Sequence, residues 1–415
     1  MLNKTLKISK AKKQIILLYS SSVFGVAFGI LNSVVNTRAL APSEYGDYRY
    51  VQNIIDFITS LLLFGYFTSG SRLLALSKNE EQSRNIRGAM CFILGIAISL
   101  LMVALLIIGF CNVLPIEANL LFLAIPVCGY SLMLNYINTV GQGDNHIGRI
   151  SIARLLPPGL YCIVAFFVYK YWGASSSKML LLYDGIGVVI YIILIFSTKP
   201  KFSNLKDSLL VLFRENRHYG FNVYLGSLVA VSTQYIAGIT LGKFCIDNSN
   251  VGFYTLSATM AAPLSMLPMI IGTTFFKQFA SQRKIEKKVL TSSFMLTFAS
   301  CLLFILLIKY IVAFLYDDSY SSVGLYAAFL AIATSINGLG DLFNRFLGAH
   351  GQGKYIRNGA FACGFITVLG NVLLVYFWKI NGAIVTRILS ASVYFIFMLA
   401  SYFFYTKKSI MKNEK

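Results

Sequence analysis

The stretch GAMCFILGIAISLLMVALLIIGF, residues 88–110, contains no charged residue. The hydrocarbon core of a bilayer accepts a helix of about 20 apolar residues, so this stretch is long enough to cross a membrane. Similar runs recur along the chain and predict about twelve transmembrane helices. The runs cover residues 15–35, 48–70, 88–110, 119–140, 152–172, 179–197, 220–242, 253–276, 290–314, 323–348, 358–378 and 382–405. Because they are continuous rather than alternating, they indicate helices and not membrane β-strands.

The composition of the whole chain supports the same class. Of its 415 residues, 57% are hydrophobic and only 13% are charged. A soluble domain carries about 25% charged residues, so this chain has too few to cover a surface that faces water. The seven cysteines are an odd number and lie mostly in apolar runs, which argues against a disulfide framework or a metal site. We therefore expect an all-α integral membrane protein.

The basic residues indicate how the helices are oriented. The chain has 36 Lys and Arg against 16 Asp and Glu, a formal net charge of +20. Most of these bases lie in the two tails and in every second connection, including 198–219 and 277–288. Bases collect on the cytoplasmic side of membrane proteins, so we expect both termini to be cytoplasmic. The orientation in the membrane then explains most of the excess positive charge. We therefore expect no nucleic-acid partner.

Short motifs repeat at a separation of roughly 205 residues, which is the mark of an internal repeat. Tyr45-Gly46-Asp47-Tyr48 opens the second span, and Val251-Gly252-Phe253-Tyr254 opens the eighth. Gly141-Gln142-Gly143 follows the fourth span, and Gly351-Gln352-Gly353 follows the tenth. Two halves with an even number of spans share one orientation. The repeat thus predicts two parallel six-helix halves around a central cavity that holds the substrate path.

The predicted halves are residues 1–197 and 220–415, and residues 198–219 join them. In this linker, Phe202, Leu205 and Leu209 fall on one helical face, while charged residues supply the polar positions. Such a pattern is typical of an amphipathic helix at a membrane interface. We expect the linker to lie on the cytoplasmic surface as a passive tether.

The residues between the first two spans carry a family resemblance. The segment Arg38-Ala-Leu-Ala-Pro-Ser-Glu-Tyr-Gly-Asp-Tyr48 resembles the R-x-L-x-P-x-E-[FY]-G-x-Y entry of polysaccharide transporters. These transporters belong to the multidrug/oligosaccharidyl-lipid/polysaccharide (MOP) superfamily, and the similarity is greatest to O-antigen flippases of the Wzx type. The stretch from Gly65 to Arg72 and the two Gly-Gln-Gly turns also resemble family features.

This resemblance implies a MATE-like fold and a specific transport reaction. The protein would move an undecaprenyl-pyrophosphate-linked oligosaccharide, the O-antigen repeat unit, from the cytoplasmic to the periplasmic leaflet of the bacterial inner membrane. Its implied partners are this substrate, membrane lipid, and the O-antigen polymerase with its chain-length regulator. The sequence contains no Walker motif, paired-cysteine motif or GxSxG elbow. We therefore expect no cofactor, no metal and no enzymatic activity.

Polar residues inside the second span form one stripe. Arg49, Gln52, Asn53 and Asp56 follow the spacing i, i+3, i+4, i+7, which places all four on one helical face. Ionisable side chains at membrane depth usually face a cavity or one another. The first three are therefore candidates for substrate binding. Asp56 either pairs with a base such as Arg49 or carries a proton as a coupling residue.

Two further spans carry candidates of the same kind. Asp341 and Arg345 in the tenth span are four residues apart, so they lie on one helical face. This spacing favours an ion pair between them. The alternative is that Arg345 contacts the substrate and Asp341 couples transport. Asn135 and Asn138 in the fourth span suit sugar hydroxyls and interhelical hydrogen bonds equally well.

Two arginines lie toward the outer side, against the general bias of charge. Arg38 ends the first span, and Arg387 lies a few residues inside the twelfth. Each either snorkels to lipid headgroups or binds phosphate, for which the arginine fork is well suited. The candidate substrate-binding set is Arg38, Arg49, Gln52, Asn53, Asn135, Asn138, Arg345 and Arg387, with Asp56 and Asp341 as coupling residues.

Other functions stay open at this stage. A cation-coupled multidrug exporter of the same superfamily would favour buried carboxylates, but here Asp56 and Asp341 are accompanied by Arg49 and Arg345. A flippase for capsule or for a peptidoglycan precursor is another alternative. A membrane-embedded polymerase or acyltransferase is disfavoured, because the outer loops are short and none of the three His lies inside a predicted span.

Overall fold

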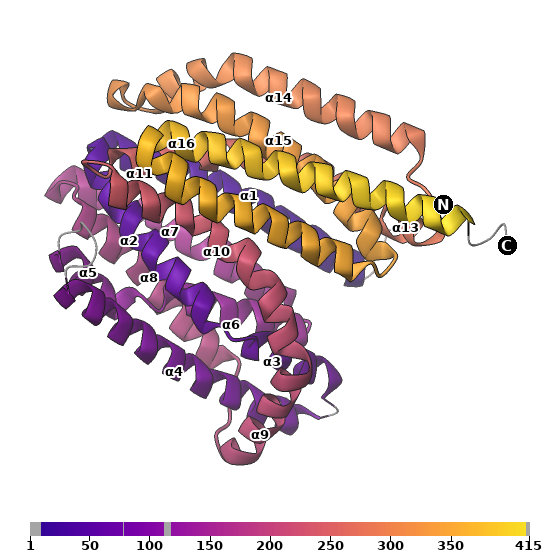
Figure 1. The fold of residues 1–415 in the computed structure, drawn as a ribbon. Helices are drawn as coiled ribbons and strands as arrows, with labels where there is room; N and C mark the ends of the chain where they lie inside the picture. The colour runs from indigo at the N-terminus through magenta and orange to yellow at the C-terminus, as the bar shows by residue number, and fades with distance from the viewer. Residues whose placement is uncertain (1–9, 78, 112–117, 412–415) are drawn as a thin grey trace, which may run out of the picture. The chain divides into compact units, whose positions relative to one another are not determined.

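The computed structural model describes residues 10–77, 79–111 and 118–411, and in these ranges the chain forms helices and no β-strand (Figure 1). This confirms the all-α class. Contacts divide the chain into two compact units. The first comprises residues up to Ala39 together with Ile55–Leu225, and the second comprises Leu40–Ile54 together with residues from Gly226 onward.

The helices follow one another with short connections. The elements up to the middle of the chain are α1 (Lys10–Ala39), α2 (Pro42–Leu62), α3 (Tyr66–Leu76), α4 (Glu80–Cys111), α5 (Ala118–Ala124), η1 (Ile125–Val127), α6 (Tyr130–Gly143), α7 (Ile147–Trp172), α8 (Ser176–Ser197), α9 (Leu205–Glu215) and η2 (Asn216–Gly220). The remaining elements are α10 (Phe221–Phe244), α11 (Ser249–Ala261), α12 (Pro263–Thr274), α13 (Phe276–Ser281), α14 (Lys287–Leu315), η3 (Asp318–Tyr320), α15 (Ser322–Ala349) and α16 (Gly353–Met411).

The helix lengths fit a multi-pass membrane protein. In the described residues, eight helical segments are long and apolar enough to cross a membrane, or nine if α2 and α3, bent by 57°, form one broken span. α16 is interrupted at Lys379, where φ is 50°, and each of its two arms exceeds the roughly 20 residues that a span needs. α1 and α10, with 30 and 24 residues, are also long enough. Counted by length in this way, the helices agree with the expected number of about twelve spans.

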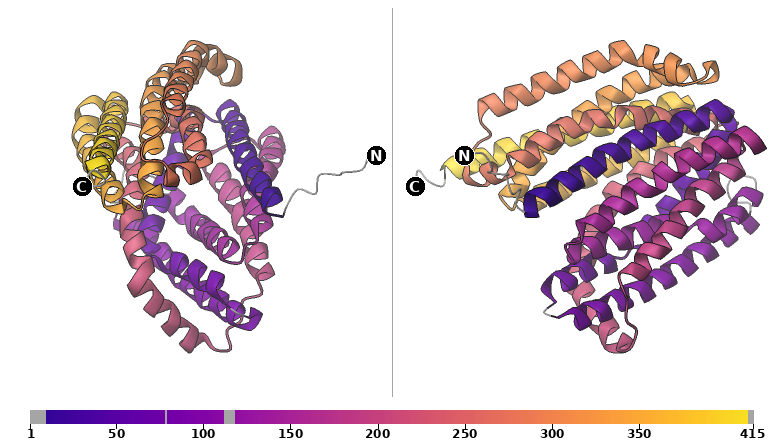
Figure 2. Two further views of the ribbon diagram at one scale, coloured as in Figure 1. Left: turned by 90° about the vertical axis from the view of Figure 1, so that its right-hand side faces the viewer. Right: turned by 180° about the vertical axis from the view of Figure 1, so that it is seen from behind.

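In the first unit, α1 lies along α7 and α4 lies against α9 (Figure 2). The α1–α7 contact includes polar groups, because Asn32 Nδ2 donates to the carbonyl oxygen of Pro158 over 3.1 Å. One turn further along α1, the Tyr161 hydroxyl donates to Asn36 Oδ1 over 2.5 Å. Such side-chain hydrogen bonds join helices inside a membrane, where lipid offers no alternative partner.

In the second unit, α15 is the central helix and packs against α11, α12, α14 and α16 (Figure 1). Its residues Leu342, Phe343 and Phe346 are almost completely buried and form a core with Phe279 and Met398. Glycine allows the neighbours to approach closely: a Cβ atom on Gly338 would lie 3.1 Å from the Ser265 backbone. Small residues at helix contacts are the usual means of tight packing within membranes.

The segment that carries the family resemblance has a clear packing role in this unit. Tyr45 and Tyr48 are fully buried, and Asp47 accepts a hydrogen bond from Asn248 Nδ2 over 2.7 Å. Gly46 lies so close to the Asn248 carbonyl group that a side chain would overlap with it. The repeat-related Gly252 is also near, since a Cβ atom there would lie 3.3 Å from the Gly46 Cα. The two equivalent motifs of the repeat thus pack against each other through glycine.

The segment 198–219 contains the helix expected there. α9 buries Leu212 and exposes Arg214 and Lys206, as an amphipathic helix does. The division into 1–197, 198–219 and 220–415, the parallel arrangement of the halves and their orientation in the membrane stay predictions.

Candidate functional site

A small polar cavity surrounds Arg387 in the second unit. Its volume is about 210 Å³, and its walls come from α10, α11 and both arms of α16. The polar lining residues are Gln234, Tyr254, Thr367, Asn371 and Arg387. The cavity therefore combines one guanidinium with amide and hydroxyl groups, all supplied by helices.

The hydrogen bonds of this cavity leave binding capacity unused. Asn371 donates through Nδ2 to the Thr367 carbonyl oxygen over 2.8 Å, but its buried Oδ1 has no hydrogen-bond partner. In the described part of the chain, no hydrogen bond or ion pair joins Arg387 to another residue. A buried polar atom without a partner is costly, so the arrangement favours a ligand that supplies hydrogen bonds and negative charge.

Asp341 lies in the same unit but has a different partner from the one expected. The Tyr394 hydroxyl donates to Asp341 Oδ1 over 2.8 Å, and Asn344 Nδ2 donates to the Tyr394 oxygen over 2.7 Å. The expected ion pair between Asp341 and Arg345 is not formed in the structure. The i, i+4 spacing permits such a pair, but the phenol of the neighbouring α16 satisfies the carboxylate instead.

Arg345 instead extends along α12. A Cβ atom added to Gly272 would lie 3.0 Å from the Arg345 Cγ, so the aliphatic part of the arginine packs on that glycine. Arg345 as a whole is exposed. Long basic side chains often bury the stem and leave the charge accessible. The position leaves Arg345 available for an anion without placing it in the cavity of Arg387.

Within the polar stripe of α2, Arg49 is bonded to residues of its own helix. Arg49 Nε donates to the Tyr45 hydroxyl over 2.9 Å, and Arg49 Nη1 donates to Gln52 Oε1 over 2.7 Å. The guanidinium carbon also lies 5.2 Å from the centre of the Tyr45 ring. A side chain added at Gly238 in α10 would overlap with the Asn53 amide, which places Asn53 at the contact between α2 and α10.

The polar residues of α6 lie in the first unit, as does Asp56. Ser131 donates a hydrogen bond to Asp56 Oδ1. Asn135 Nδ2 donates to the Ser131 carbonyl oxygen over 2.9 Å, within its own helix. Asn138 Oδ1 is buried without a hydrogen-bond partner. Asp56, Ser131 and Asn135 are thus neighbours.

Arg38 lines a second basic cavity, which has a volume of about 570 Å³. The cavity lies in the first unit, between the end of α1 and the end of α7, and Lys170 and Tyr169 also line it. Two cations at one rim favour an anionic group. Each unit therefore contains one cavity with a sequence-predicted arginine, Arg38 in the first and Arg387 in the second.

Sequence reasoning missed two buried charges in the first unit. Arg87 and Asp144 form an ion pair of 2.9 Å, and their side chains are only 6% and 5% exposed. Arg87 also donates to Glu80 and to the Thr198 carbonyl oxygen, over 2.8 and 2.9 Å. The sequence did contain a signal for this pair. Asp144 directly follows Gly141-Gln142-Gly143, in a connection where basic residues are expected on the cytoplasmic side, so an acid there stands out.

A third missed charge is Asp184, which lies inside α8 and is 3% exposed. Tyr183 beside it makes ring contacts with Tyr130 and Tyr161. An acid within an apolar run was a visible signal. Among the described residues, no three His, Cys, Asp or Glu side chains are grouped so that they could hold a metal ion.

Solved structures of other proteins share this arrangement of helices. A multidrug resistance MATE family transporter of the MOP superfamily, in an inward-facing conformation, matches with a TM-score of 0.70 and 15% identity over 95% of this chain and 99% of that one. Lipid II flippase MurJ, in an inward closed conformation, matches with a TM-score of 0.72 and 11% identity over 95% of this chain and 91% of that one. The chain therefore has the fold of the MOP superfamily.

The family follows from the sequence itself. The family model described as "Polysaccharide biosynthesis protein" matches residues 11–281, and the chain belongs to that family. Among curated proteins, no sequence matches this chain.

Proposed function

We propose that this protein is a flippase for an undecaprenyl-pyrophosphate-linked oligosaccharide, the O-antigen repeat unit. It would act in the bacterial inner membrane, with both termini cytoplasmic, and move its substrate from the cytoplasmic to the periplasmic leaflet. The observation that carries the proposal is the cavity of Arg387, a guanidinium among amide and hydroxyl groups in a member of the polysaccharide biosynthesis family.

The chemistry of the substrate matches the groups in this cavity. A diphosphate-linked sugar cannot cross hydrocarbon unaided, because both its charges and its hydroxyls lose their hydration there. A guanidinium can bind phosphate oxygens through two parallel hydrogen bonds. Gln234 and Asn371 can exchange hydrogen bonds with hydroxyl groups. The reaction requires binding and release only, with no covalent step.

The size of the cavity limits what it holds at one time. Its volume of about 210 Å³ is below the range of about 300–1,000 Å³ that is usual for small-molecule sites. It therefore accommodates one phosphate or part of one sugar and not a whole oligosaccharide. Arg38 and Lys170 in the first unit offer a second place for an anionic group.

Two carboxylates are proposed as coupling residues. Asp56 accepts a hydrogen bond from Ser131, and Asp341 accepts one from Tyr394. A carboxylate in such a place can be neutral at one stage of transport and charged at another. Consumption of the product by the O-antigen polymerase and its chain-length regulator is the alternative source of direction.

The neighbours in fold supply the competing substrates. One is named as a lipid II flippase and others as multidrug transporters. A lipid-linked glycan agrees best with the family and with an arginine in the cavity, because cationic drugs would favour an excess of acids.

Deletion of the gene tests the proposal. We expect loss of surface polysaccharide, accumulation of the lipid-linked repeat unit on the cytoplasmic side, and restoration of both by the wild-type chain. Accumulation of the peptidoglycan precursor would instead indicate a lipid II substrate. Drug sensitivity with normal surface polysaccharide would indicate a drug exporter, and either result would overturn the O-antigen proposal.

A further inference from the structure

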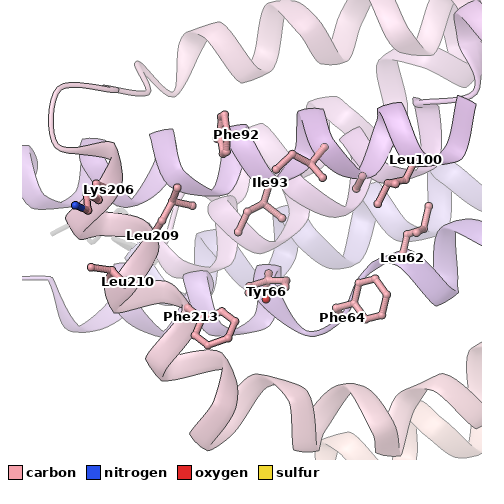
Figure 3. Close-up of a pocket in the computed structure, with 12 residues that line it drawn as sticks. Leu62, Phe64, Tyr66, Phe92, Ile93, Leu100, Lys206, Leu209, Leu210 and Phe213 are labelled. Carbon is pink, nitrogen blue, oxygen red and sulfur yellow. The ribbon is translucent and has the colours of Figure 1, made fainter. Parts of the chain in front are cut away.

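The first unit contains an apolar groove, and none of the residues proposed to bind the transported substrate lines it. It has a volume of about 470 Å³ and is formed by α4, α9 and the bend between α2 and α3 (Figure 3). Its walls include Leu62, Phe64, Phe92, Leu209 and Phe213. The volume is within the range of about 300–1,000 Å³ that is usual for small-molecule sites.

The groove is long and open at its side. Phe92 and Leu100 both line it from α4, and eight residues of helix span about 12 Å at 1.5 Å per residue. Phe92, Leu100 and Phe213 are 43%, 49% and 58% exposed, so apolar surface remains uncovered by the protein. In a membrane protein this shape and lining fit a hydrocarbon chain that lies along α4.

One cation stands at one end of the groove. Figure 3 shows Lys206 on α9 at one end, beside Leu209 and Leu210, with Leu100 and Leu62 toward the opposite end. Lys206 is the only charged residue in the lining, and in the described part of the chain no hydrogen bond or ion pair joins it to another residue. Its neighbour Asp207 lines a different pocket, together with Glu81, so the acid is turned away from the groove.

Two other bases near the groove are already paired with acids. Arg72 forms an ion pair with Glu215, and Lys201 forms one with Glu81 over 2.6 Å. Among the described residues, Lys206 is thus a base without an acidic partner, and it is the one that lines the groove itself. A lysine ammonium acts as a point charge toward phosphate, which suits a single phosphodiester at the membrane surface.

We propose that this groove binds one anionic phospholipid of the surrounding membrane, with an acyl chain along α4 and the headgroup phosphate at Lys206. The bound lipid would hold the amphipathic helix α9 on the bundle at the bend between α2 and α3. The groove's single point charge favours a phosphodiester over the diphosphate of the transport substrate, which has arginines in both cavities described above. The proposal depends on the membrane location of the chain and not on the flippase function.

A photoreactive lipid tests this site. The purified protein is placed in phosphatidylcholine vesicles that contain phosphatidylglycerol with a photoreactive acyl chain, and cross-linked peptides are mapped. We expect cross-links in α4 and α9, and we expect phosphatidylglycerol to compete better than phosphatidylcholine. Lys206→Gln should lower cross-linking about fivefold, since one lysine near an anionic membrane contributes roughly that factor. Arg214→Gln, an exposed base on the same helix, should leave it unchanged.

A second variant tests the groove itself. Ile96 lines the groove and is 47% exposed, so Ile96→Trp should fill the space without disturbing a buried core and should displace the probe. Ile107→Trp, at a position on α4 that is 57% exposed and outside the groove, is the matched control. Equal competition by the two phospholipids, or equal cross-linking of the two tryptophan variants, would overturn the proposal. Preferential displacement by undecaprenyl phosphate would also overturn it and would identify the polyprenyl tail as the occupant.

Discussion

Arg387 carries the positive charge of the cavity in the second unit. Arg387→Ala should reduce export of the glycan by about tenfold or more, because hydrogen bonds to charged groups contribute about 1.5–3 kcal/mol. Arg387→Lys should restore only part of the loss, since lysine lacks the planar fork. Surface polysaccharide is measured by immunoblot at matched protein level. Arg357→Ala, at an exposed position on the first arm of α16, is the control. Full polysaccharide display by Arg387→Ala would remove the main support for an anion site there.

Asp56 is the carboxylate proposed to couple transport. Asp56→Asn should abolish transport, because the amide cannot alternate between a neutral and a charged state. The double variant Asp56→Asn with Arg49→Gln should not recover activity. Ser131→Ala removes the hydrogen-bond donor only, and we expect partial activity. Recovery in the double variant would show that Asp56 merely balances a charge, which ends its coupling role.

Single residues show where sequence reasoning succeeds and where it stops. The stripe on α2 was predictable because helical periodicity fixes which residues share a face. The partner of Asp341 was not, because Tyr394 comes from another helix, about fifty residues further along the chain. The cavity of Arg387 likewise combines α10, α11 and α16, and one sequence does not state which helix faces meet.

At the scale of helices, the pair of Arg87 and Asp144 joins α4 to the end of α6. Both side chains are buried, so removing one partner leaves an uncompensated charge. Arg87→Ala should therefore lower the free energy of unfolding by about 3–5 kcal/mol. Thermal unfolding in detergent, followed by tryptophan fluorescence or circular dichroism, measures this as a lower Tm.

A double-mutant cycle separates this pair from its surroundings. The double variant Arg87→Ala with Asp144→Ala should lose much less free energy of unfolding than the sum of the two single variants. The effects of mutations are not additive when the residues belong to one interaction network. Arg149, whose Nη1 lies 3.9 Å from the same carboxylate, is more exposed, and Arg149→Ala should cost less than Arg87→Ala. Additive costs at Arg87 and Asp144 would mean that the two do not interact in the membrane protein.

Helix positions were largely predictable from hydropathy, and their breaks were not. The apolar run 48–70 reads as one span, yet the chain bends by 57° between α2 and α3. Gly65 allows this bend, because its φ of 81° is a left-handed conformation that other residues avoid. A Cβ atom there would also overlap with the Gly220 carbonyl group. Gly65 and Gly220 are far apart in the sequence, so the periodicity of apolar residues does not predict their contact.

At the scale of the molecule, the distribution of bases predicts the topology. Tags placed in 198–219 and 278–288 should report the cytoplasm, and a tag in 317–321 should report the opposite side. Tags at residues 1 and 415 should be cytoplasmic and one in 113–117 should not, although these positions lie outside the described residues. Reporter fusions to alkaline phosphatase and green fluorescent protein measure the side. A periplasmic signal from 278–288 would break the proposed orientation.

The family and the fold could be predicted from the whole chain, because both depend on features spread along it. The run of apolar segments gave the class, and the segment from Arg38 to Tyr48 gave the family resemblance. The structure adds that Tyr45, Gly46 and Tyr48 pack a helix crossing. A packing motif marks the family without specifying a sugar, which explains why the substrate cannot be predicted from it.

Leaflet access in reconstituted vesicles tests the central claim most directly. Vesicles contain the purified protein and the undecaprenyl-pyrophosphate-linked repeat unit, and a membrane-impermeant periodate reagent is added outside to oxidise accessible sugars. Without transport, only the outer-leaflet fraction reacts, and the inner-leaflet fraction stays protected. The account predicts that wild-type vesicles expose the protected fraction with time, whereas Arg387→Ala vesicles of equal protein content resemble protein-free vesicles. A wild-type rate equal to that of protein-free vesicles would contradict it.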